Sequence, residues 1–302
     1  MQIGLVGLGR MGGNIARRLC RADIHVVGFD TGAGVAEALA GEPGFVAAYS
    51  VDSLLLALKA PRIVWAMLPA GEPTRRLMDE LFAKLAPGDR VIDGANGHYR
   101  EAMARAERFE TVGIGFVDAG VSGGVWGLAN GYSLMVGGTE DDVKSLERVF
   151  QALAPNPGQW LRCGPAGAGH FVKMVHNGIE YGLLQAYAEG FALMKDHPDF
   201  DLDPGAIAGT WMQGSVVRSW LLELARDVLA ADPSLAGAAP VVAESGEGRW
   251  TAQESIDRAV PTPVITAALM QRFASQGRDD FANRLLATLR NRFGGHAIPP
   301  IK

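Results

Sequence analysis

A glycine-rich turn near the N-terminus constrains the fold of this 302-residue chain more than any other feature. Residues Gln2 to Val6 have the apolar character of a short buried strand, and Gly7 follows directly. A helix ending near Cys20 and a second strand, Ile24 to Phe29, are predicted after the turn. A strand, a glycine turn, a helix and a strand in this order are typical of the unit that binds a dinucleotide in α/β proteins.

Each glycine of the turn has a separate task in such a unit. Gly7 permits the tight turn, Gly9 lets backbone amides approach a pyrophosphate, and Gly12 allows the helix to pack closely on the strand. The N-terminus of the helix favours an anion. The predicted cofactor-binding turn consists of Gly7, Leu8, Gly9, Arg10, Met11 and Gly12.

The acidic residue Asp30 ends the second strand and indicates which dinucleotide is bound. A carboxylate there accepts hydrogen bonds from the hydroxyls of the adenosine ribose and repels a 2′-phosphate. Thr31 follows, and none of the next few residues is an arginine that could receive a 2′-phosphate. We therefore predict NAD in preference to NADP; the alternative is an aspartate that only shapes a turn.

Four further strands are expected, with helical segments between several of them: Arg62 to Leu68, Arg90 to Asp93, Gly115 to Asp118 and Ser133 to Gly137. The order predicts a doubly wound, mostly parallel sheet, in which ligands bind outside the carboxyl ends of the strands. Each candidate residue at these ends could also be an ordinary turn residue. The candidates are Met67 and Leu68 for the cofactor, Asn96 for cofactor and substrate, and Ser122, Gly123 and Gly124 for a substrate carboxylate.

A polar stripe is predicted on a helix that begins the second half of the chain. Lys173, His176, Asn177 and Glu180 stand at i, i+3, i+4 and i+7, so a helix places them on one face. Their neighbours are mostly apolar, and burial can move the pKa of a lysine towards neutrality. This favours acid/base chemistry, whereas the alternative is a helix with one wet face or a structural hydrogen-bonded cluster.

The second half is predicted to be helical. Long amphipathic segments follow one another from about Gly169 to Phe293, and the boundary between two domains is expected near residues 164–167. A chain of 302 residues can form two cores, although a single domain is the alternative. We expect an NAD-binding α/β domain at residues 1–165 and an all-α domain for substrate binding and oligomerisation at residues 166–302.

Composition excludes several classes of partner. A net charge of −5 and a pI near 5.7 argue against nucleic acid, but one local basic pocket for an anionic metabolite remains compatible. Cys20 and Cys163 form no metal-ligand spacing, so we name no metal ligand and expect reduced thiols. Met1 leads almost directly into the first strand, without a basic leader or a long apolar run, which predicts a cytoplasmic protein with no membrane partner.

Two segments give the chain a resemblance to a known family. They are the run from Gly167 to Tyr181, Gly-Ala-Gly-His-Phe-Val-Lys-Met-Val-His-Asn-Gly-Ile-Glu-Tyr, and the run from Gly246 to Thr251, Gly-Glu-Gly-Arg-Trp-Thr. Together with the glycine turn and residues 118–124, they resemble the β-hydroxyacid dehydrogenase superfamily and, within it, the 6-phosphogluconate dehydrogenase family. The length resembles the short form of that family, whose members are often NAD-linked.

The resemblance implies an oxidative decarboxylation of 6-phospho-D-gluconate to D-ribulose 5-phosphate and CO₂, in a gluconate or pentose phosphate route. It implies that Lys173 takes the proton of the C3 hydroxyl and later donates to the developing oxyanion, while Glu180 protonates C1. His176 and Asn177 would orient substrate hydroxyls. Related hydroxyisobutyrate-type enzymes resemble the first segment only through the lysine and the asparagine, so Glu180 separates the two kinds of enzyme.

Phosphate recognition both matches the family and departs from it. Arg272 and Tyr181 match family residues of the phosphate pocket, but Ser245 stands where the family has a phosphate-binding lysine. Arg249 is a candidate replacement for that lysine. Arg290 and His296 match an arginine and a histidine that enter the active site of a neighbouring subunit, which implies a homodimer or homotetramer. The alternative for these last two residues is a solvated helix end.

Two other functions remain open. A simple β-hydroxyacid dehydrogenase acting on a small acid without phosphate would not depend on Arg272, Arg290 or His296. An NAD-binding sensor or scaffold without turnover would need only the glycine turn and Asp30, and the stripe around Lys173 would then be structural.

Overall fold

The computed structural model describes residues 1–294 and 297. The chain separates into two compact units, one formed by Met1–Met174 and one that begins at Val175. The first unit is built on a mostly parallel sheet and the second is helical. The predicted fold class, an α/β dinucleotide-binding domain followed by an all-α domain, is therefore confirmed.

The sheet of the first unit has eight strands in the order β3-β2-β1-β4-β5-β6-β7-β8. The strands from β3 to β6 in this order are parallel, β7 is antiparallel to β6, and β8 is parallel to β7. The chain order reverses beside β1, where β2 lies on one side and β4 on the other, which is the place where doubly wound sheets bind ligands. The strands are β1 (Gln2–Val6), β2 (His25–Phe29), β3 (Phe45–Ala47), β4 (Ile63–Ala66), β5 (Arg90–Asp93), β6 (Gly115–Ser122), β7 (Ser133–Gly137) and β8 (Trp160–Gly164).

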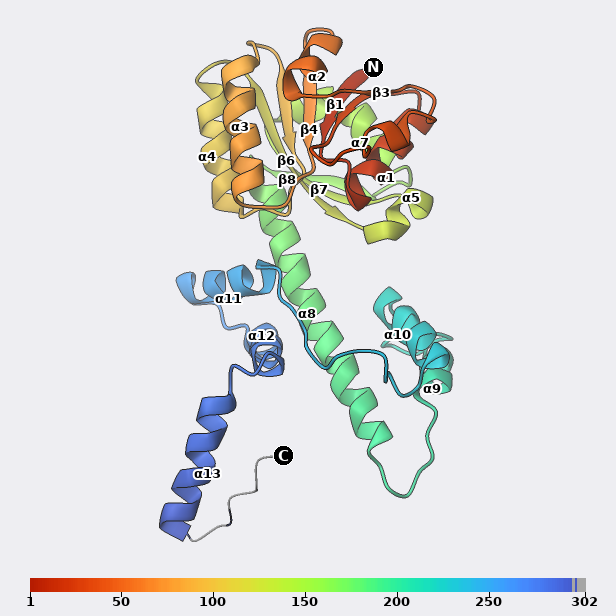
Figure 1. The fold of residues 1–302 in the computed structure, drawn as a ribbon, viewed down its shortest axis with the longest axis vertical. Helices are drawn as coiled ribbons and strands as arrows, with labels where there is room; N and C mark the ends of the chain where they lie inside the picture. The colour runs from red at the N-terminus through yellow and green to blue at the C-terminus, as the bar shows by residue number, and fades with distance from the viewer. Residues whose placement is uncertain (295–296, 298–302) are drawn as a thin grey trace. The chain divides into compact units, whose positions relative to one another are not determined.

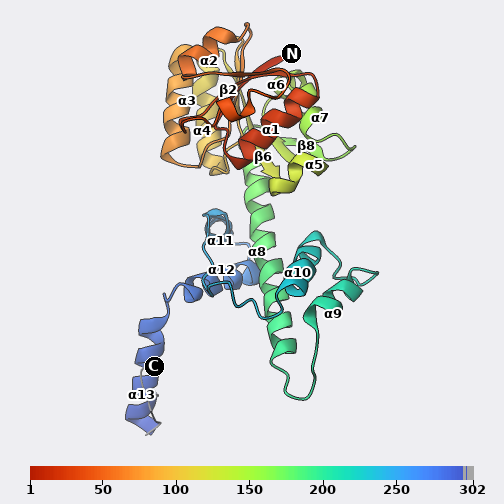
Figure 2. The ribbon, with the colours of Figure 1, turned by 45° about the vertical axis from the view of Figure 1, so that its right-hand side comes forward.

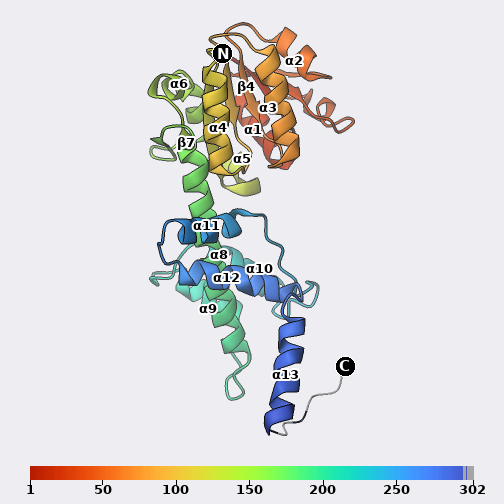
Figure 3. The ribbon, with the colours of Figure 1, turned by 90° about the vertical axis from the view of Figure 1, so that its left-hand side faces the viewer.

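Helices cover both faces of this sheet. On one face α3 and α4 lie side by side, as Figures 1 and 3 show, and bury a cluster that includes Leu81 and Phe109. On the other face α1 and α7 lie in front of the sheet in Figure 2 and bury Ile15 and Phe150. The helices are α1 (Arg10–Arg21), α2 (Val51–Ala57), α3 (Glu72–Lys84), α4 (Tyr99–Glu110), α5 (Gly127–Asn130), α6 (Glu140–Ser145) and α7 (Glu147–Leu153), with short 3₁₀ turns at Glu37–Leu39 and Gly124–Trp126.

Three of the predicted strands have the predicted boundaries without change, namely β1, β5 and β7. Strand β6 runs to Ser122, four residues beyond the predicted end at Asp118, so Asp118 lies within the strand and not in a loop. Strands β3 and β8 were not predicted. β3 has only three residues, and β8 has a mixed burial pattern that shows neither alternation nor a continuous apolar run.

Helix α8 (Ala168–Lys195) is 28 residues long and supplies residues to both units. In the second unit, Tyr181 of α8 packs with Ala252 and Leu269 in one small apolar cluster, and Phe191 packs with Leu222 and others in a second. The remaining helices are α9 (Pro204–Trp211), α10 (Trp220–Ala231), α11 (Glu247–Asp257), α12 (Pro263–Ser275) and α13 (Asp280–Gly294).

Both cysteines are free, Cys20 in the core and Cys163 on β8. Burial is the main cause that raises the pKa of each thiol, which keeps both in the less reactive protonated form. Across residues 1–294, no helix combines the length and the apolar character needed to cross a membrane.

Candidate functional site

The glycine turn is built around backbone contacts that no side chain could share. Gly7 has φ +91°, and a Cβ on it would lie 2.4 Å from the carbonyl oxygen of Met67. A Cβ on Gly12 would lie 1.8 Å from the carbonyl oxygen of Gly7, so α1 packs directly on the turn. A Cβ on Gly9, by contrast, meets no atom within 4 Å. The turn thus leaves open space at Gly9, the N-cap of α1, where the first backbone N–H groups of the helix can receive a pyrophosphate.

Asp30, directly after β2, binds the backbone of the glycine turn through its carboxylate. Its Oδ2 accepts a hydrogen bond from the backbone N–H of Leu8 at 2.7 Å, and its Oδ1 accepts one from Gly32 at 2.7 Å. The carboxylate is half-buried beside the turn. This is the position from which an acidic residue receives ribose hydroxyls in dinucleotide-binding units, so the residues present fit an adenosine dinucleotide.

The ends of β4 and β5 carry the other predicted cofactor residues. Met67 and Leu68 follow β4 directly, and both line the side of the turn at Gly7. Asn96 is exposed in the loop between β5 and α4. The buried Asp93 shapes that loop, because its carboxylate accepts a hydrogen bond from Ala95 N at 3.2 Å and forms an ion pair with Arg105 at 2.7 Å.

The predicted carboxylate-binding residues lie at the end of β6. Ser122 is the last residue of the strand, and Gly123 and Gly124 have φ values of +127° and +52°. These positive φ values turn the chain sharply after the strand, a conformation that glycine adopts without strain. Two successive backbone N–H groups in such a turn can bind an anion.

Lys173 is buried against the sheet, with 9% of its surface exposed. A Cβ on Gly120 of β6 would lie only 2.4 Å from the Cβ of Lys173. The aliphatic part of the lysine side chain therefore packs directly on the strand backbone, where Gly120 has no side chain. The same close packing holds one turn earlier, where a Cβ on Gly169 would lie 2.5 Å from the carbonyl oxygen of Met135. The lysine is therefore placed by the sheet, not by a flexible loop.

Asp118 anchors the start of α8 to this sheet. It is fully buried on β6, and its Oδ1 and Oδ2 accept hydrogen bonds from the backbone N–H groups of Gly167 at 2.6 Å and His170 at 2.7 Å. Charge-assisted hydrogen bonds to the first turn of a helix satisfy donors that have no partner within the helix. The prediction for residues 118–124 missed this role, because it assumed that the strand ended at Asp118.

The other three residues of the polar stripe lie further along α8. His176, Asn177 and Glu180 are all half-buried, and His176 Nδ1 lies 3.1 Å from Asn177 Oδ1. The helical spacing places all three on the same face of α8 as Lys173. The predicted helix that carries the stripe is therefore confirmed, whereas the chemical roles of its residues remain predictions.

Two predicted phosphate-binding residues meet in the second unit. The guanidinium of Arg272 lies 3.4 Å from the centroid of the buried Tyr181 ring, and its Nη1 donates to the carbonyl oxygen of Ala243 at 3.0 Å. The backbone N–H of Ser245 donates to the hydroxyl of Tyr181 at 3.3 Å. A Cβ on Gly248 would lie 2.3 Å from the same ring, so α11 also packs against Tyr181.

Arg249 has a carboxylate partner in the chain itself. Its Nη2 and Nε donate to Glu244 Oε1 at 2.6 and 3.0 Å, and its guanidinium lies 5.0 Å from the centroid of Phe273. Ser245 donates its hydroxyl to the buried Glu247 at 2.6 Å. Sequence reasoning missed both glutamates, since an acidic residue next to a basic one gives no sign of which charge faces a ligand.

The last two predicted substrate residues belong to the C-terminal end. Arg290 is exposed on α13. His296 lies outside the described residues.

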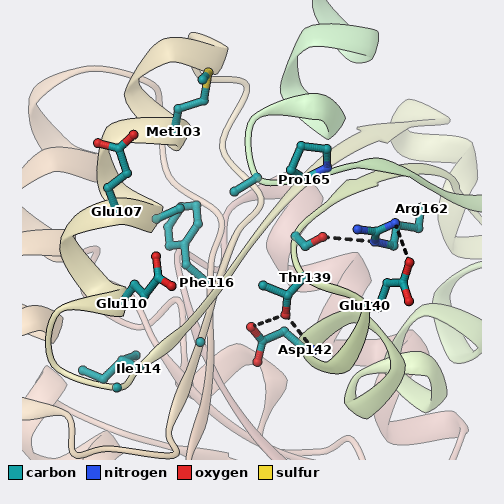
Figure 4. Close-up of a pocket in the computed structure, with 15 residues that line it drawn as sticks. Met103, Glu107, Glu110, Ile114, Phe116, Thr139, Glu140, Asp142, Arg162 and Pro165 are labelled. Carbon is teal, nitrogen blue, oxygen red and sulfur yellow. Dashed lines mark hydrogen bonds and ion pairs between the residues drawn. The ribbon is translucent and has the colours of Figure 1, made fainter.

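A pocket of about 760 Å³ in the first unit is lined by none of the predicted site residues. Figure 4 shows it between α4, the start of β6 and the segment that leads into α6. Arg162 at its edge donates to the carbonyl oxygen of Gly138 at 3.0 Å, and Thr139 donates to Asp142 at 2.8 Å. The pocket is therefore separate from the candidate site.

The doubly wound sheet, the glycine turn at its switch point and the buried lysine on the first helix of an all-α unit define a class, that of the two-domain dehydrogenases that use a nicotinamide dinucleotide. Comparisons with known proteins identify the family within this class. The pattern for the NAD binding domain of 6-phosphogluconate dehydrogenase matches residues 2–164, and that for the C-terminal domain of the same enzyme matches residues 169–293. The chain belongs to the 6-phosphogluconate dehydrogenase family.

Individual relatives agree with this assignment. The chain is 42% identical over 299 residues to an NAD(+)-dependent, decarboxylating 6-phosphogluconate dehydrogenase of Haloferax volcanii, covering 99% of this chain and 98% of the relative. It is 36% identical to a decarboxylating 6-phosphogluconate dehydrogenase of Saccharomyces cerevisiae, covering 94% of this chain but 61% of that longer protein. The structure of Plasmodium falciparum 6-phosphogluconate dehydrogenase superposes with a TM-score of 0.84 at 26% identity, covering 100% of this chain and 67% of that one.

Proposed function

We propose that the protein catalyses the oxidative decarboxylation of 6-phospho-D-gluconate to D-ribulose 5-phosphate and CO₂ with reduction of NAD. The observation that carries the proposal is the buried Lys173, which the bare backbone at Gly120 and the anchored start of α8 hold in one place. Membership of the 6-phosphogluconate dehydrogenase family supplies the reaction class.

Lys173 is the proposed acid and base of the reaction. It takes the proton from the C3 hydroxyl of the substrate as that carbon is oxidised to a ketone. The nicotinamide cofactor, when bound at the glycine turn, supplies the acceptor for the hydride of C3. The protonated lysine then donates to the carbonyl oxygen at C3 while the C1 carboxylate leaves as CO₂, so the electrons of the broken bond form an enediol without a metal ion.

Glu180 is the proposed acid that completes the reaction. It gives a proton to the enediol carbon that was C2 of the substrate and becomes C1 of the product, the ketone ribulose 5-phosphate. His176 and Asn177 orient the substrate hydroxyls through the hydrogen bonds that their side chains can make. Asn96, Ser122, Gly123 and Gly124 hold the end of the substrate that carries the carboxylate.

NAD is the proposed cofactor in preference to NADP. The carboxylate of Asp30 is already placed by two backbone N–H groups, and a 2′-phosphate beside it would face a negative charge. The NAD(+)-dependent Haloferax volcanii relative supports the same preference.

Arg272 and Arg249 are the proposed phosphate-binding cations. Arg272 is held on the face of Tyr181, which restricts its guanidinium before a ligand arrives. Arg249 would take the place of the family lysine, since this chain has Ser245 at the position of that lysine. To bind phosphate, the guanidinium of Arg249 would have to leave its partner Glu244 or contact the phosphate and Glu244 together. This arrangement predicts weaker phosphate binding than two cations without a carboxylate partner would give.

A homodimer or homotetramer is the proposed assembly. Helix α13 exposes Phe281, Leu285, Leu286 and Leu289, with exposed fractions between 47% and 79%. Four large apolar side chains on one helix exceed the scattered exposure of an ordinary surface. Arg290 on the same helix, together with His296, would then reach the active site of a neighbouring subunit.

Two matched pairs of variants test the proposal by NADH formation and CO₂ release. Lys173→Met should lower turnover at least about 10²-fold, the usual scale for a general base, while Lys144→Met, at an exposed lysine of α6, should have no effect. Glu180→Gln should impair the decarboxylating reaction, while Glu189→Gln further along α8 should not. Full activity of Lys173→Met would contradict the role of Lys173 as acid and base, and full activity of Glu180→Gln would contradict the role of Glu180 as the second acid.

A further inference from the structure

His170 connects three elements at the start of α8. The residue is 2% exposed, and its backbone N–H donates to Asp118 Oδ2 on β6. Its ring Nε2 lies 3.1 Å from the carbonyl oxygen of Asp93 at the end of β5. A carbonyl oxygen can only accept, so Nε2 carries the ring proton and donates it to Asp93.

The second ring nitrogen of His170 has a different environment. Nδ1 is buried and has no hydrogen-bond partner in the part of the chain that the structure describes. With the proton on Nε2, Nδ1 of the neutral ring is an acceptor. A buried polar atom without a partner is destabilising, so its retention requires an explanation.

The unpaired edge of the ring faces the loop that carries Asn96. A Cβ on Gly97 would lie 3.7 Å from both Nδ1 and Cε1 of His170. Arg105 is another donor nearby, and its two terminal nitrogens are directed to the carboxylates of Asp93 and Glu101, each at 2.7 Å. The N–H groups of this loop are therefore donors close to Nδ1.

We propose that His170 is a positioning residue whose Nδ1 accepts a hydrogen bond from the segment Asn96–Gly97 when cofactor and sugar acid are bound. His170 and Lys173 stand one turn apart on the same face of α8, so this bond sets Asn96 relative to the lysine. The inference rests on the function proposed for Asn96 and Lys173. It assigns to His170 a task that the substrate-binding residues cannot perform alone, namely the alignment of the β5 loop with the reacting helix.

Two substitutions of His170 test the roles of its two ring nitrogens separately. Glutamine at position 170 can place its amide N–H where Nε2 lies and keep the bond to Asp93, but it offers no acceptor at Nδ1. Asparagine can place an amide oxygen near Nδ1 but cannot reach Asp93. His170→Gln should keep the wild-type melting temperature. Its kcat should fall about 3- to 10-fold, which corresponds to the net free energy of one hydrogen bond. His170→Asn should melt lower and retain more of the wild-type kcat than His170→Gln.

Hydrogen exchange gives a readout that does not depend on turnover. In the wild type, NADH with 6-phosphogluconate should slow exchange at the amides of residues 96–98; His170→Gln should lose this protection and His170→Asn should retain it. His197→Gln, at an exposed histidine after α8, is the matched control. A histidine with only a structural role predicts the opposite, with His170→Gln equal to wild type in kcat, KM and protection, and this result would overturn the inference.

The test also separates this inference from the proposed function. If the wild type oxidises 6-phosphogluconate and Lys173→Met does not, the function stands whatever His170 does. If His170→Gln fails to fold, Gly97→Ala replaces it, because a methyl group there makes only ordinary contact with the ring but obstructs a closer approach. Gly97→Ala should lower kcat at unchanged melting temperature, and unchanged kcat would count against the inference.

Discussion

Gly120→Ala tests whether the sheet places the catalytic lysine. A methyl group at this position would lie 2.4 Å from Lys173 Cβ, 3.0 Å from its Cγ and 3.0 Å from the carbonyl oxygen of Gly169. None of these atoms is the free end of a side chain, so a rotamer change cannot remove the conflict. The start of α8 must move away from β6 instead.

The size of the effect follows from these distances. Ordinary contacts begin near 3.4 Å, so the helix must move by about 1 Å from its contact at 2.4 Å. A misplacement of about 1 Å at a reacting group costs on the order of 10²-fold in rate. Overpacking of a buried site also costs about 1–3 kcal/mol of the free energy of unfolding.

The assay measures kcat by NADH formation, the affinity for NADH by fluorescence, and the melting temperature. We expect Gly120→Ala to lose about 10²-fold in kcat while NADH binding persists, because the glycine turn lies on another strand. Gly190→Ala is the control on the same helix α8, since a Cβ there meets no atom within 4 Å. It should keep kcat and gain about 0.5–1 kcal/mol of stability. A folded Gly120→Ala protein with wild-type kcat would refute the account of how Lys173 is placed.

Three further variants test other parts of the structure. Asp30→Ala should weaken NAD and improve the relative use of NADP, because the charge that opposes a 2′-phosphate is removed. Arg272→Lys keeps the charge but loses the planar contact with Tyr181, so KM for 6-phosphogluconate should rise about tenfold with a smaller change in kcat. Burial raises the pKa of Tyr132 to about 12, so the free energy of unfolding should fall by at most about 2–3 kcal/mol as pH rises from 10 to 12, and Tyr132→Phe should abolish this fall.

Each of these predictions has a contradicting result. An unchanged ratio of NAD to NADP use would refute the role of Asp30, and an unchanged KM would refute that of Arg272. Tyr132 has no hydrogen-bond partner for its buried hydroxyl within the described residues, so Tyr132→Phe should be as stable as wild type at pH 7. Chemical denaturation at several pH values checks this, and an equal fall in the variant above pH 10 would contradict the assignment to Tyr132.

Much of the fold could be predicted because local patterns determined it. The glycine turn and the flanking apolar runs predicted β1, α1 and β2, and helical periodicity predicted α8 and the helices after it. The β6 strand was predicted too short because Asp118 looked like a strand end. A buried carboxylate inside a strand is favoured only when distant backbone donors meet it, and the N–H groups of Gly167 and His170 lie 49 and 52 residues away.

The site shows the same limit. The spacing of Lys173, His176 and Glu180 is visible in the sequence, because one helix carries all three. The packing of Lys173 on Gly120 and the ion pair of Arg249 with Glu244 depend on which atoms meet in space. Tertiary contacts of this kind leave no periodic pattern in the sequence. The candidate reacting groups could therefore be predicted from the sequence, but the contacts that position them could not.

The most direct test of the central claim is the ratio of NADH formed to CO₂ released by the purified protein with 6-phosphogluconate. Gluconate and 3-hydroxyisobutyrate serve as parallel substrates, and NADP as the parallel cofactor. We expect NADH and CO₂ in equal amounts, with the phosphorylated acid only. NADH without CO₂ on one of the smaller acids would contradict it and would identify a dehydrogenase that does not decarboxylate.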